Sequence, residues 1–282
     1  MATVNGASSS SSSTSTSLPS AAPLSSSSSS TPSHPKFDSI DSAVAEIGRG
    51  NFVVVLDDED RENEGDLIIA ADKVTTEQMA WLIRHSSGFV CISLHPSRIA
   101  ALNLPMMFPN NQEPNKTAYT VTVDYKHNTT TGISAHDRAL TSRMLAATGT
   151  DAKGEAAGAR ANAQDFTRPG HLCPLRYTEG GVRVRRGHTE AAVDLATAAN
   201  LPPAALLCEL VDPDSPQGSI ASRDACFKFA RQHDLKIITI DALKAWREEK
   251  EGPLPAELVK IAGSAKQRGV DLQEQSVVGP RA

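Results

Sequence analysis

The chain of 282 residues lacks a long apolar run, so we expect neither a membrane span nor a secretory signal. Its first 35 residues also lack lysine and arginine, which argues against a mitochondrial transit helix. They are almost wholly Ser, Thr, Ala and Pro, and such a segment has too little apolar surface to offset the entropy cost of ordering. We therefore predict a disordered Ser/Thr-rich tail at 1–35, a folded domain at 36–250, and a C-terminal helix or disordered tail at 251–282.

Basic tracts are missing as well, and the formal net charge is -5, so we do not expect nucleic-acid binding as the main function. The cysteines show no CxxC spacing, which argues against a zinc site, and each lies in or beside an apolar segment. They are Cys91, Cys173, Cys208 and Cys226. We interpret them as reduced thiols and predict a cytoplasmic protein.

The residues after the tail alternate between apolar runs and stretches of helical spacing. Strands are expected at 52–56, 67–71, 89–94, 118–124, 172–177, 182–184, 205–211 and 236–240, with a hairpin-like turn at 179–181 and a small-residue loop at 148–163. Helices are expected at 40–47, 75–88, 96–102, 135–147, 189–200, 222–233 and after a cap at Asp241. Because the two kinds of element do not alternate strictly, we predict an α+β fold with helices on both faces of a mixed sheet.

The most informative motif is acidic and directly follows the apolar run 52–56. Seven of the ten residues 57–66 carry carboxylates, and one of the others is Arg61. So many like charges beside a buried strand cost free energy unless something positive binds there. A solvated acidic turn is the general alternative, but the apolar run 67–71 confines the cluster between two strands, where sites are commonly built. We therefore predict that a divalent cation or a phosphorylated substrate binds here.

A second motif at 183–190 combines three arginines with Gly187, His188 and Thr189. If a strand turns into a helix here, backbone N–H groups, Thr189 and the arginines converge on one anion, as in a phosphate site. His188 is either a metal ligand or an ordinary residue at a helix start. One glutamate and one histidine, completed by water and substrate oxygens, suit Mg2+ or Mn2+ better than zinc. The motif alone does not say which glutamate.

Other residues each leave two interpretations open. Glu209 lies inside an apolar strand, so it is either an acid–base group or a carboxylate with structural hydrogen bonds. His171 follows a Pro-Gly pair and could merely close a turn. Cys91 has the surroundings of a core thiol and not of a nucleophile. The hydroxyl-rich segment 129–138 either binds phosphate at a helix N-terminus or caps that helix.

Over residues 38–248 these motifs together resemble the 3,4-dihydroxy-2-butanone 4-phosphate synthases of riboflavin biosynthesis, in their fungal-type monofunctional form. The resemblance rests on the motifs at 57–66, 84–88, 131–138, 170–176 and 186–190. It implies a catalytic domain at 36–250 and a three-layer α/β/α sandwich. The implied activity is that of a metal-dependent lyase, which converts D-ribulose 5-phosphate to L-3,4-dihydroxy-2-butanone 4-phosphate and formate. The resemblance further implies a homodimer with active sites at the interface.

Site residues follow from the same resemblance. Glu62 and His188 are the implied ligands of Mg2+ or Mn2+, with two ions per site once substrate is bound. The implied substrate contacts are Arg61, Glu62, Asp66, Thr117, Thr131, Asp137, Arg185, Arg186, Gly187, His188, Thr189 and Glu209. The catalytic candidates are His171, Glu209, Glu64, Asp57 and Cys91. Two other hypotheses are a non-catalytic module that binds a metal and a phosphosugar, and a metal-dependent aldolase or isomerase acting on pentose phosphates.

Overall fold

The computed structural model describes residues 36–147, 161–260 and 262. Our predictions for 1–35, for most of the loop 148–163 and for residues beyond 262 therefore lie outside the described residues. Residues 256–260 are helical, and among the described residues no helix is both long and apolar enough to span a membrane.

The described chain is built on one mixed sheet of seven strands in the order β4-β5-β3-β6-β2-β1-β7. The strands are β1 Val53–Leu56, β2 Gly65–Ala70, β3 Cys91–Leu94, β4 Val123–Tyr125, β5 Phe166–Arg176, β6 Ala204–Glu209 and β7 Lys236–Thr239. Strand β3 runs parallel to β5, and β1 runs parallel to β7, whereas the other neighbouring pairs are antiparallel. The predicted mixed sheet is confirmed.

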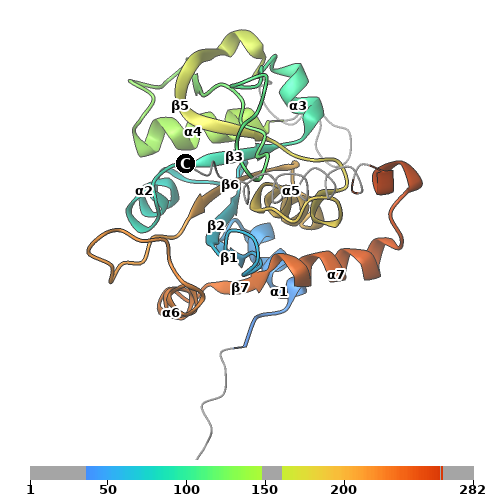
Figure 1. Ribbon diagram of the computed structural model, residues 1–282. Coiled ribbons are helices and arrows are strands. Elements are labelled where there is room, and N and C mark those ends of the chain that lie inside the picture. The colour runs from blue at the N-terminus through green and yellow to red at the C-terminus, as the bar shows by residue number, and fades with distance from the viewer. Residues whose placement is uncertain (1–35, 148–160, 261, 263–282) are drawn as a thin grey trace, which may run out of the picture. The chain divides into compact units, whose positions relative to one another are not determined.

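Helices cover both faces of this sheet (Figure 1). They are α1 Ile40–Arg49, α2 Thr76–His85, α3 Pro96–Ala101, α4 Ala135–Ala146, α5 His188–Ala198, α6 Arg223–Gln232 and α7 Ile240–Glu251. Side chains of a strand alternate between faces, so Val54 and Leu56 join the core under α2, α4 and α6, while Val53 and Val55 join the core under α1, α5 and α7. Both faces of the central strands are apolar, which explains why these segments read as continuous apolar runs.

Caps place most helix starts where the sequence predicts them. Ser39 caps α1, and Thr75 forms the predicted capping box with Gln78 at the start of α2. The predicted cap at Asp241 is wrong, because Thr239 caps α7 and its hydroxyl accepts a hydrogen bond from the Ala242 amide. Strand β7 leads directly into α7, so the cap is the last residue of the strand.

Two strand predictions are also wrong. Of the segment 118–124, only the last two residues join a regular strand, β4, and earlier residues of this segment make isolated bridges. The expected strand at 182–184 is replaced by a 3-10 turn, Gly181–Arg183. Here Gly180 and Gly181 have φ of 91° and 63°, and the Val182 amide donates to Asp194 Oδ2 instead of a neighbouring strand.

Candidate functional site

The acidic motif forms the connection between β1 and its antiparallel neighbour β2, where Leu56 pairs with Gly65. Asp57 organises this turn, because its carboxylate accepts hydrogen bonds from the backbone amides of Glu62 and Glu64 and from the Arg61 guanidinium, at 3.2, 2.9 and 2.7 Å. Asp57 is buried, so these contacts compensate its lost hydration. The local sequence thus directs Glu62 and Glu64 toward the open end of the sheet.

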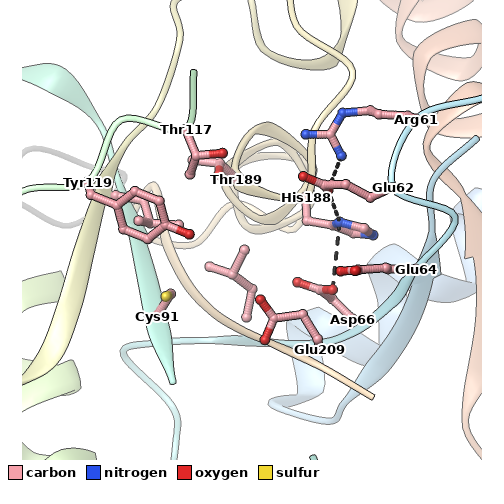
Figure 2. A pocket seen from close by; sticks show the side chains of 12 residues that line it. Arg61, Glu62, Glu64, Asp66, Cys91, Thr117, Tyr119, His188, Thr189 and Glu209 are labelled. Carbon is pink, nitrogen blue, oxygen red and sulfur yellow. Dashed lines mark hydrogen bonds and ion pairs between the residues drawn. The ribbon is translucent and has the colours of Figure 1, made fainter. Parts of the chain in front are cut away.

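A small cavity of about 60 Å³ lies beside this turn (Figure 2). It is lined by Arg61, Glu62, Glu64, Asp66, Cys91, Thr117, Tyr119, Leu175, His188, Thr189, Leu207 and Glu209. Four carboxylates gather on one side, whereas the hydroxyl groups of Thr117 and Tyr119 and the thiol of Cys91 lie on the other (Figure 2).

His188 begins α5 and points its ring into the carboxylate side of the cavity. Its Nε2 lies 3.1 Å from the carbonyl oxygen of Val55, and a carbonyl only accepts, so Nε2 donates. The other nitrogen, Nδ1, lies 3.6 Å from Asp66 Oδ1 and 3.8 Å from Glu62 Oε2. The backbone of β1 therefore fixes the ring so that Nδ1 faces two carboxylates.

The electrostatics of this cluster require a positive charge. Burial acts to lower the pKa of His188, but Asp66, Glu62 and Asp57 raise it to about 9. Burial raises the pKa of Asp66 to about 7, with help from Glu209 and against the charge of His188. For Glu62, burial opposes ionisation, but His188 and Arg61 together lower the pKa to about 2. In the absence of a metal, a proton on His188 supplies the charge that a cation would otherwise bring.

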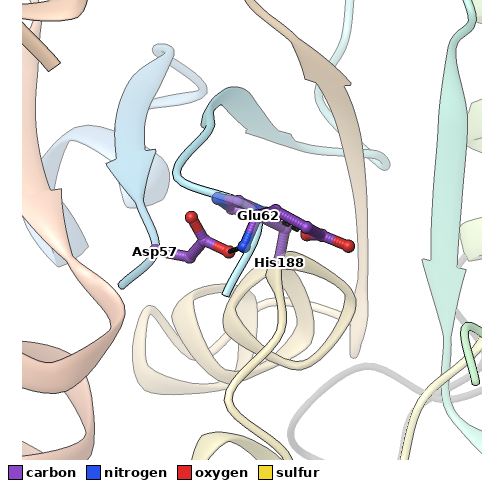
Figure 3. Close-up of side chains that lie close together, drawn as sticks. All are labelled: Asp57, Glu62 and His188. Atoms are coloured by element: carbon purple, nitrogen blue, oxygen red, sulfur yellow. Dashed lines mark hydrogen bonds and ion pairs between the residues drawn. The ribbon is translucent and has the colours of Figure 1, made fainter. Parts of the chain in front are cut away.

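The donor set fits a divalent cation. Asp57, Glu62 and His188 each offer one ligand atom, and these atoms all lie within 4.8 Å of one another (Figure 3). In addition, Asp66 Oδ1 is buried without a hydrogen-bond partner. Carboxylates with one imidazole suit Mg2+ and Mn2+. The Asp57 oxygens already accept three hydrogen bonds. Glu62 and His188 are therefore better placed than Asp57 to be ligands of a metal.

Three catalytic candidates from the sequence also line the cavity, namely Glu209, Glu64 and Cys91. Glu209 is the cross-strand partner of Asp66, and its Oε2 accepts a hydrogen bond from Ser87 Oγ at 2.8 Å, so its structural partner is a serine. Burial raises the pKa of Glu64, and the charges of Glu62 and Glu209 raise it further. The Cys173 thiol beside Cys91, together with burial, raises the pKa of Cys91 and disfavours its thiolate.

The three arginines of the predicted phosphate site diverge, whereas phosphate binding by Gly187, His188 and Thr189 stays a prediction. Arg183 pairs with Glu251 at 2.9 Å, whereas Arg186 bridges Asp58 and Asp241, both at 2.9 Å. Arg185 pairs with Glu190 at 2.6 Å. The expectation of convergence is wrong because each guanidinium has its own carboxylate nearby. Gly187 leaves room for the Arg185 guanidinium, because a Cβ at 187 would lie 2.3 Å from its Nη1. Of this motif, His188 and Thr189 reach the cavity.

A second polar cluster lies outside the cavity lining, in the middle of β5 and beside β4. His171 Nδ1 lies 2.7 Å from Asp124 Oδ2, and the His171 amide donates to the other oxygen at 2.8 Å. Gly132 packs against this pair, and a Cβ there would lie 2.0 Å from Asp124 Oδ2. Asp137 is buried and accepts hydrogen bonds from Thr130 Oγ1 and the Gly132 amide, at 2.7 and 3.0 Å.

Helix capping accounts for part of the hydroxyl-rich segment 129–138. Ser134 caps α4, because its hydroxyl accepts a hydrogen bond from the Asp137 amide. Thr131 is exposed. The structure thus gathers His171, Thr131 and Asp137 at one place, but apart from the carboxylates around His188.

Sequence reasoning missed two residues of the site. Tyr119 lines the cavity, and burial raises the pKa of its hydroxyl, which therefore stays protonated and can donate a hydrogen bond. Asn115 Nδ2 donates to Glu62 Oε1 at 2.7 Å. Tyr119 lies in the segment expected to be a strand, and Asn115 lies in an irregular stretch rich in proline and asparagine. Neither position carries a local signal for its contact.

Comparisons with known proteins identify the family of the chain. The family model for 3,4-dihydroxy-2-butanone 4-phosphate synthase matches residues 41–246. The protein of that name from Schizosaccharomyces pombe is 52% identical over 208 residues, which are 74% of this chain and 96% of the relative. The Riboflavin biosynthesis protein RibBA of Rhodococcus jostii is 50% identical over 77% of this chain, which corresponds to 49% of that relative. The chain thus spans about half the length of this longer relative.

Solved structures lead to the same family. A crystal structure of 3,4-dihydroxy-2-butanone 4-phosphate synthase in complex with two magnesium ions has a TM-score of 0.70 and 49% identity, covering 77% of this chain and 100% of that one. A cation-free form of the same enzyme has a TM-score of 0.68 and 48% identity, covering 77% of this chain and 100% of that one. The family match spans more than half of the chain and includes both clusters, so the chain belongs to the 3,4-dihydroxy-2-butanone 4-phosphate synthase family.

Proposed function

We propose that the chain converts D-ribulose 5-phosphate to L-3,4-dihydroxy-2-butanone 4-phosphate and formate, and that it does so in the cytoplasm with the catalytic domain at 36–250. Family membership makes it a lyase of riboflavin biosynthesis. The observation that carries the proposal is the cavity in which Glu62 and His188 meet Glu64, Asp66 and Glu209. Metal-binding and proton-carrying groups of this kind are what the reaction needs.

The reaction removes a proton at C3 to give an enediol and expels the C1 hydroxyl as water to give a diketone. After a skeletal shift, a water molecule adds at C4, and C4 leaves as formate. A bound cation would polarise the carbonyl and neighbouring hydroxyl oxygens of the sugar. Glu64 and Glu209 stand on the carboxylate side of the cavity as proton carriers, and Tyr119 faces them with a hydrogen-bond donor. Glu64 is suited to hold a proton, because burial and like charges raise its pKa.

We propose Mg2+ or Mn2+ as the cofactor, with two ions per site when substrate is bound. The two magnesium ions of the similar crystal structure support this proposal. In this chain Glu62 and His188 would hold the metal, and Asp57 would fix the turn that carries Glu62. We keep Arg61, Asp66, Thr117 and Thr189 as proposed substrate contacts, because all four line the cavity.

We also propose a homodimer in which each subunit completes the site of the other. His171 belongs to the second cluster, where Asp124 binds its Nδ1, so its Nε2 remains available as a proton carrier. Phe89 and Ile133 near this cluster are 53% and 50% exposed, as suits a surface covered by a partner. Thr131 would then contribute from the partner side, and Asp137 would hold the loop that carries it.

Incubation with ribulose 5-phosphate tests the proposed activity. We expect formate to form with Mg2+ and not after chelation, and we expect Glu64→Gln, His171→Asn and Glu209→Gln to slow its release. A binding module would leave the sugar phosphate intact, and an aldolase or isomerase would consume it without formate. Absence of formate with and without metal would defeat the proposal.

A further inference from the structure

The segment 111–117 forms a turn that is held together by its own side chains. The Glu113 carboxylate accepts hydrogen bonds from the backbone amides of Asn115 and Thr117, at 2.9 and 2.5 Å. Asn111 spans the turn, because its Nδ2 donates to the Thr117 carbonyl at 2.8 Å and its Oδ1 accepts from the Glu113 amide at 2.9 Å. Lys116 adopts a φ of 56°, which completes the tight geometry. Contacts between its own residues therefore hold the turn in shape.

A buried carboxylate fixes this turn to α5. Glu190 is 1% exposed, and its carboxylate binds the Arg185 guanidinium at 2.6 Å and the Thr178 amide at 3.1 Å. The other end of the guanidinium donates to the Asn115 carbonyl at 3.1 Å and to Thr117 Oγ1 at 3.0 Å. Arg185 thus connects the core of the molecule to the 111–117 turn, and its five donors suit such a bridge.

The Asn115 side chain connects this turn to Glu62, because its Nδ2 donates a hydrogen bond to Glu62 Oε1 at 2.7 Å. The second oxygen of Glu62, Oε2, accepts a hydrogen bond from Arg61 and lies 3.8 Å from His188 Nδ1. The two carboxylate oxygens therefore have separate partners. Because Asn115 occupies Oε1, the rotation of the carboxylate is restricted and Oε2 stays directed toward His188.

We propose that Asn115 is a positioning residue that orients Glu62 for binding of a divalent cation, and that the 111–117 turn exists to present it. The inference rests on the proposed function, because it takes Glu62 and His188 as the metal ligands. Carboxylates that ligate metals are commonly oriented by hydrogen bonds from outside the ligand set, and loss of such a bond costs about 10- to 100-fold in metal affinity. Without Asn115 the Glu62 side chain would have to be ordered by the metal itself.

Binding of Mn2+ alone, followed by the electron paramagnetic resonance signal of free Mn2+, tests this without any turnover. We expect Asn115→Ala to weaken Mn2+ binding by about tenfold or more. Glu113→Ala removes the acceptor that shapes the turn and should weaken binding in the same direction. The matched control is Asn110→Ala, since Asn110 is exposed in the same loop and its side chain bonds to no described residue. Its Mn2+ affinity and its thermal midpoint should both stay unchanged.

Formate assays on the same variants separate this inference from the proposed activity. For Asn115→Ala we expect a higher Mg2+ concentration at half-maximal rate, with kcat at saturating Mg2+ nearly retained. If formate forms but Asn115→Ala binds Mn2+ as tightly as the unchanged protein, the inference fails alone. If Mn2+ affinity falls as expected but no formate appears, the proposed function fails and the positioning role stands. If the unchanged protein does not bind Mn2+, the inference is overturned.

Discussion

Asp66 and Glu209 lie directly opposite each other on β2 and β6, so two carboxylates face one cavity from adjacent strands. Like charges in cross-strand positions destabilise a sheet. The arrangement therefore costs free energy of folding in the metal-free protein, and a cation would relieve that cost.

The first prediction concerns this pair. Replacing Glu209→Gln should raise the free energy of unfolding of the metal-free protein by about 0.2–1 kcal/mol, the range of cross-strand pair energies, because it removes the charge opposite Asp66. Ser87 can still donate to the amide oxygen. The same variant should lose formate production. Urea unfolding measures the change in stability. Asp60→Asn is the control for the loss of one negative charge, because Asp60 is an exposed acid in the turn between β1 and β2. A stability equal to or below that of the unchanged protein would contradict the prediction.

The second prediction concerns the metal. Because the metal binds only the folded site, Mn2+ at about 100 times its dissociation constant should stabilise the protein by about 2.7 kcal/mol. Glu62→Gln and His188→Gln should abolish most of this increment. Denaturant midpoints with and without Mn2+ measure it, and Asp60→Asn should keep the full effect. An increment that survives in both ligand variants would place the metal elsewhere.

The third prediction tests shared sites. In a mixture of Glu62→Gln and His171→Asn subunits that exchange freely, half of the dimers are mixed, and each mixed dimer has one intact site. Activity should return to about a quarter of the unchanged level, although we expect each variant alone to release formate far more slowly than that. Recovery of formate release after mixing is the measurement. If mixing restores nothing while gel filtration confirms exchange, both residues serve the same subunit.

The fourth prediction concerns pH and stability. His85 packs against Trp81 and Phe229, and burial together with His233 lowers its pKa below the ordinary value of 6.5. The unfolded chain therefore binds a proton at His85 more readily than the folded chain. This contribution to stability is fully present above pH 6.5 and is lost as the pH falls through that value toward the folded pKa.

Unfolding free energies between pH 7.5 and pH 5 would measure this effect, and His85→Phe should reduce the slope while keeping the aromatic packing. Gln232→Ala, an exposed change at the end of α6, should leave the slope unaltered. An unchanged slope in His85→Phe would show that other groups dominate.

The fifth prediction concerns Gly65, where the acidic turn meets β2. A Cβ at this position would lie 2.6 Å from Cys226 Sγ. Gly65→Ala should therefore destabilise the fold by about 1–3 kcal/mol through overpacking. Adding Cys226→Ala removes the sulfur, so the double variant should be more stable than the sum of the two single effects predicts. Strict additivity in urea unfolding would mean that the clash is relieved elsewhere.

Most elements of the fold could be predicted from the sequence because their signals are local. Thr75 and Gln78 lie three residues apart, and the apolar runs of the central strands are buried on both faces. The errors arise where the local structure depends on a residue that is distant in the sequence. Asp194 takes the Val182 amide and turns an expected strand into a 3-10 turn. Nothing near residue 182 reveals that partner.

The same distinction applies to the site. Glu62, Glu64 and Asp66 come from ten consecutive residues, so their clustering is visible in the sequence. The failed expectation for the arginines has a simple cause, since Arg186 finds Asp58 and Asp241 across the fold. Asn115 was missed because its contact with Glu62 joins residues 53 positions apart.

The hydrogen bond from His188 to the Val55 carbonyl has a consequence for quality control of the folded chain. It joins residues that lie 133 positions apart in the sequence. His188 can therefore offset the excess negative charge around β1 and β2 only after α5 has docked on the sheet. A cation that needs both Glu62 and His188 as ligands therefore binds fully folded molecules and does not bind partly folded ones. Titration with Mn2+ would then measure the correctly folded fraction of a preparation, whether or not substrate is present.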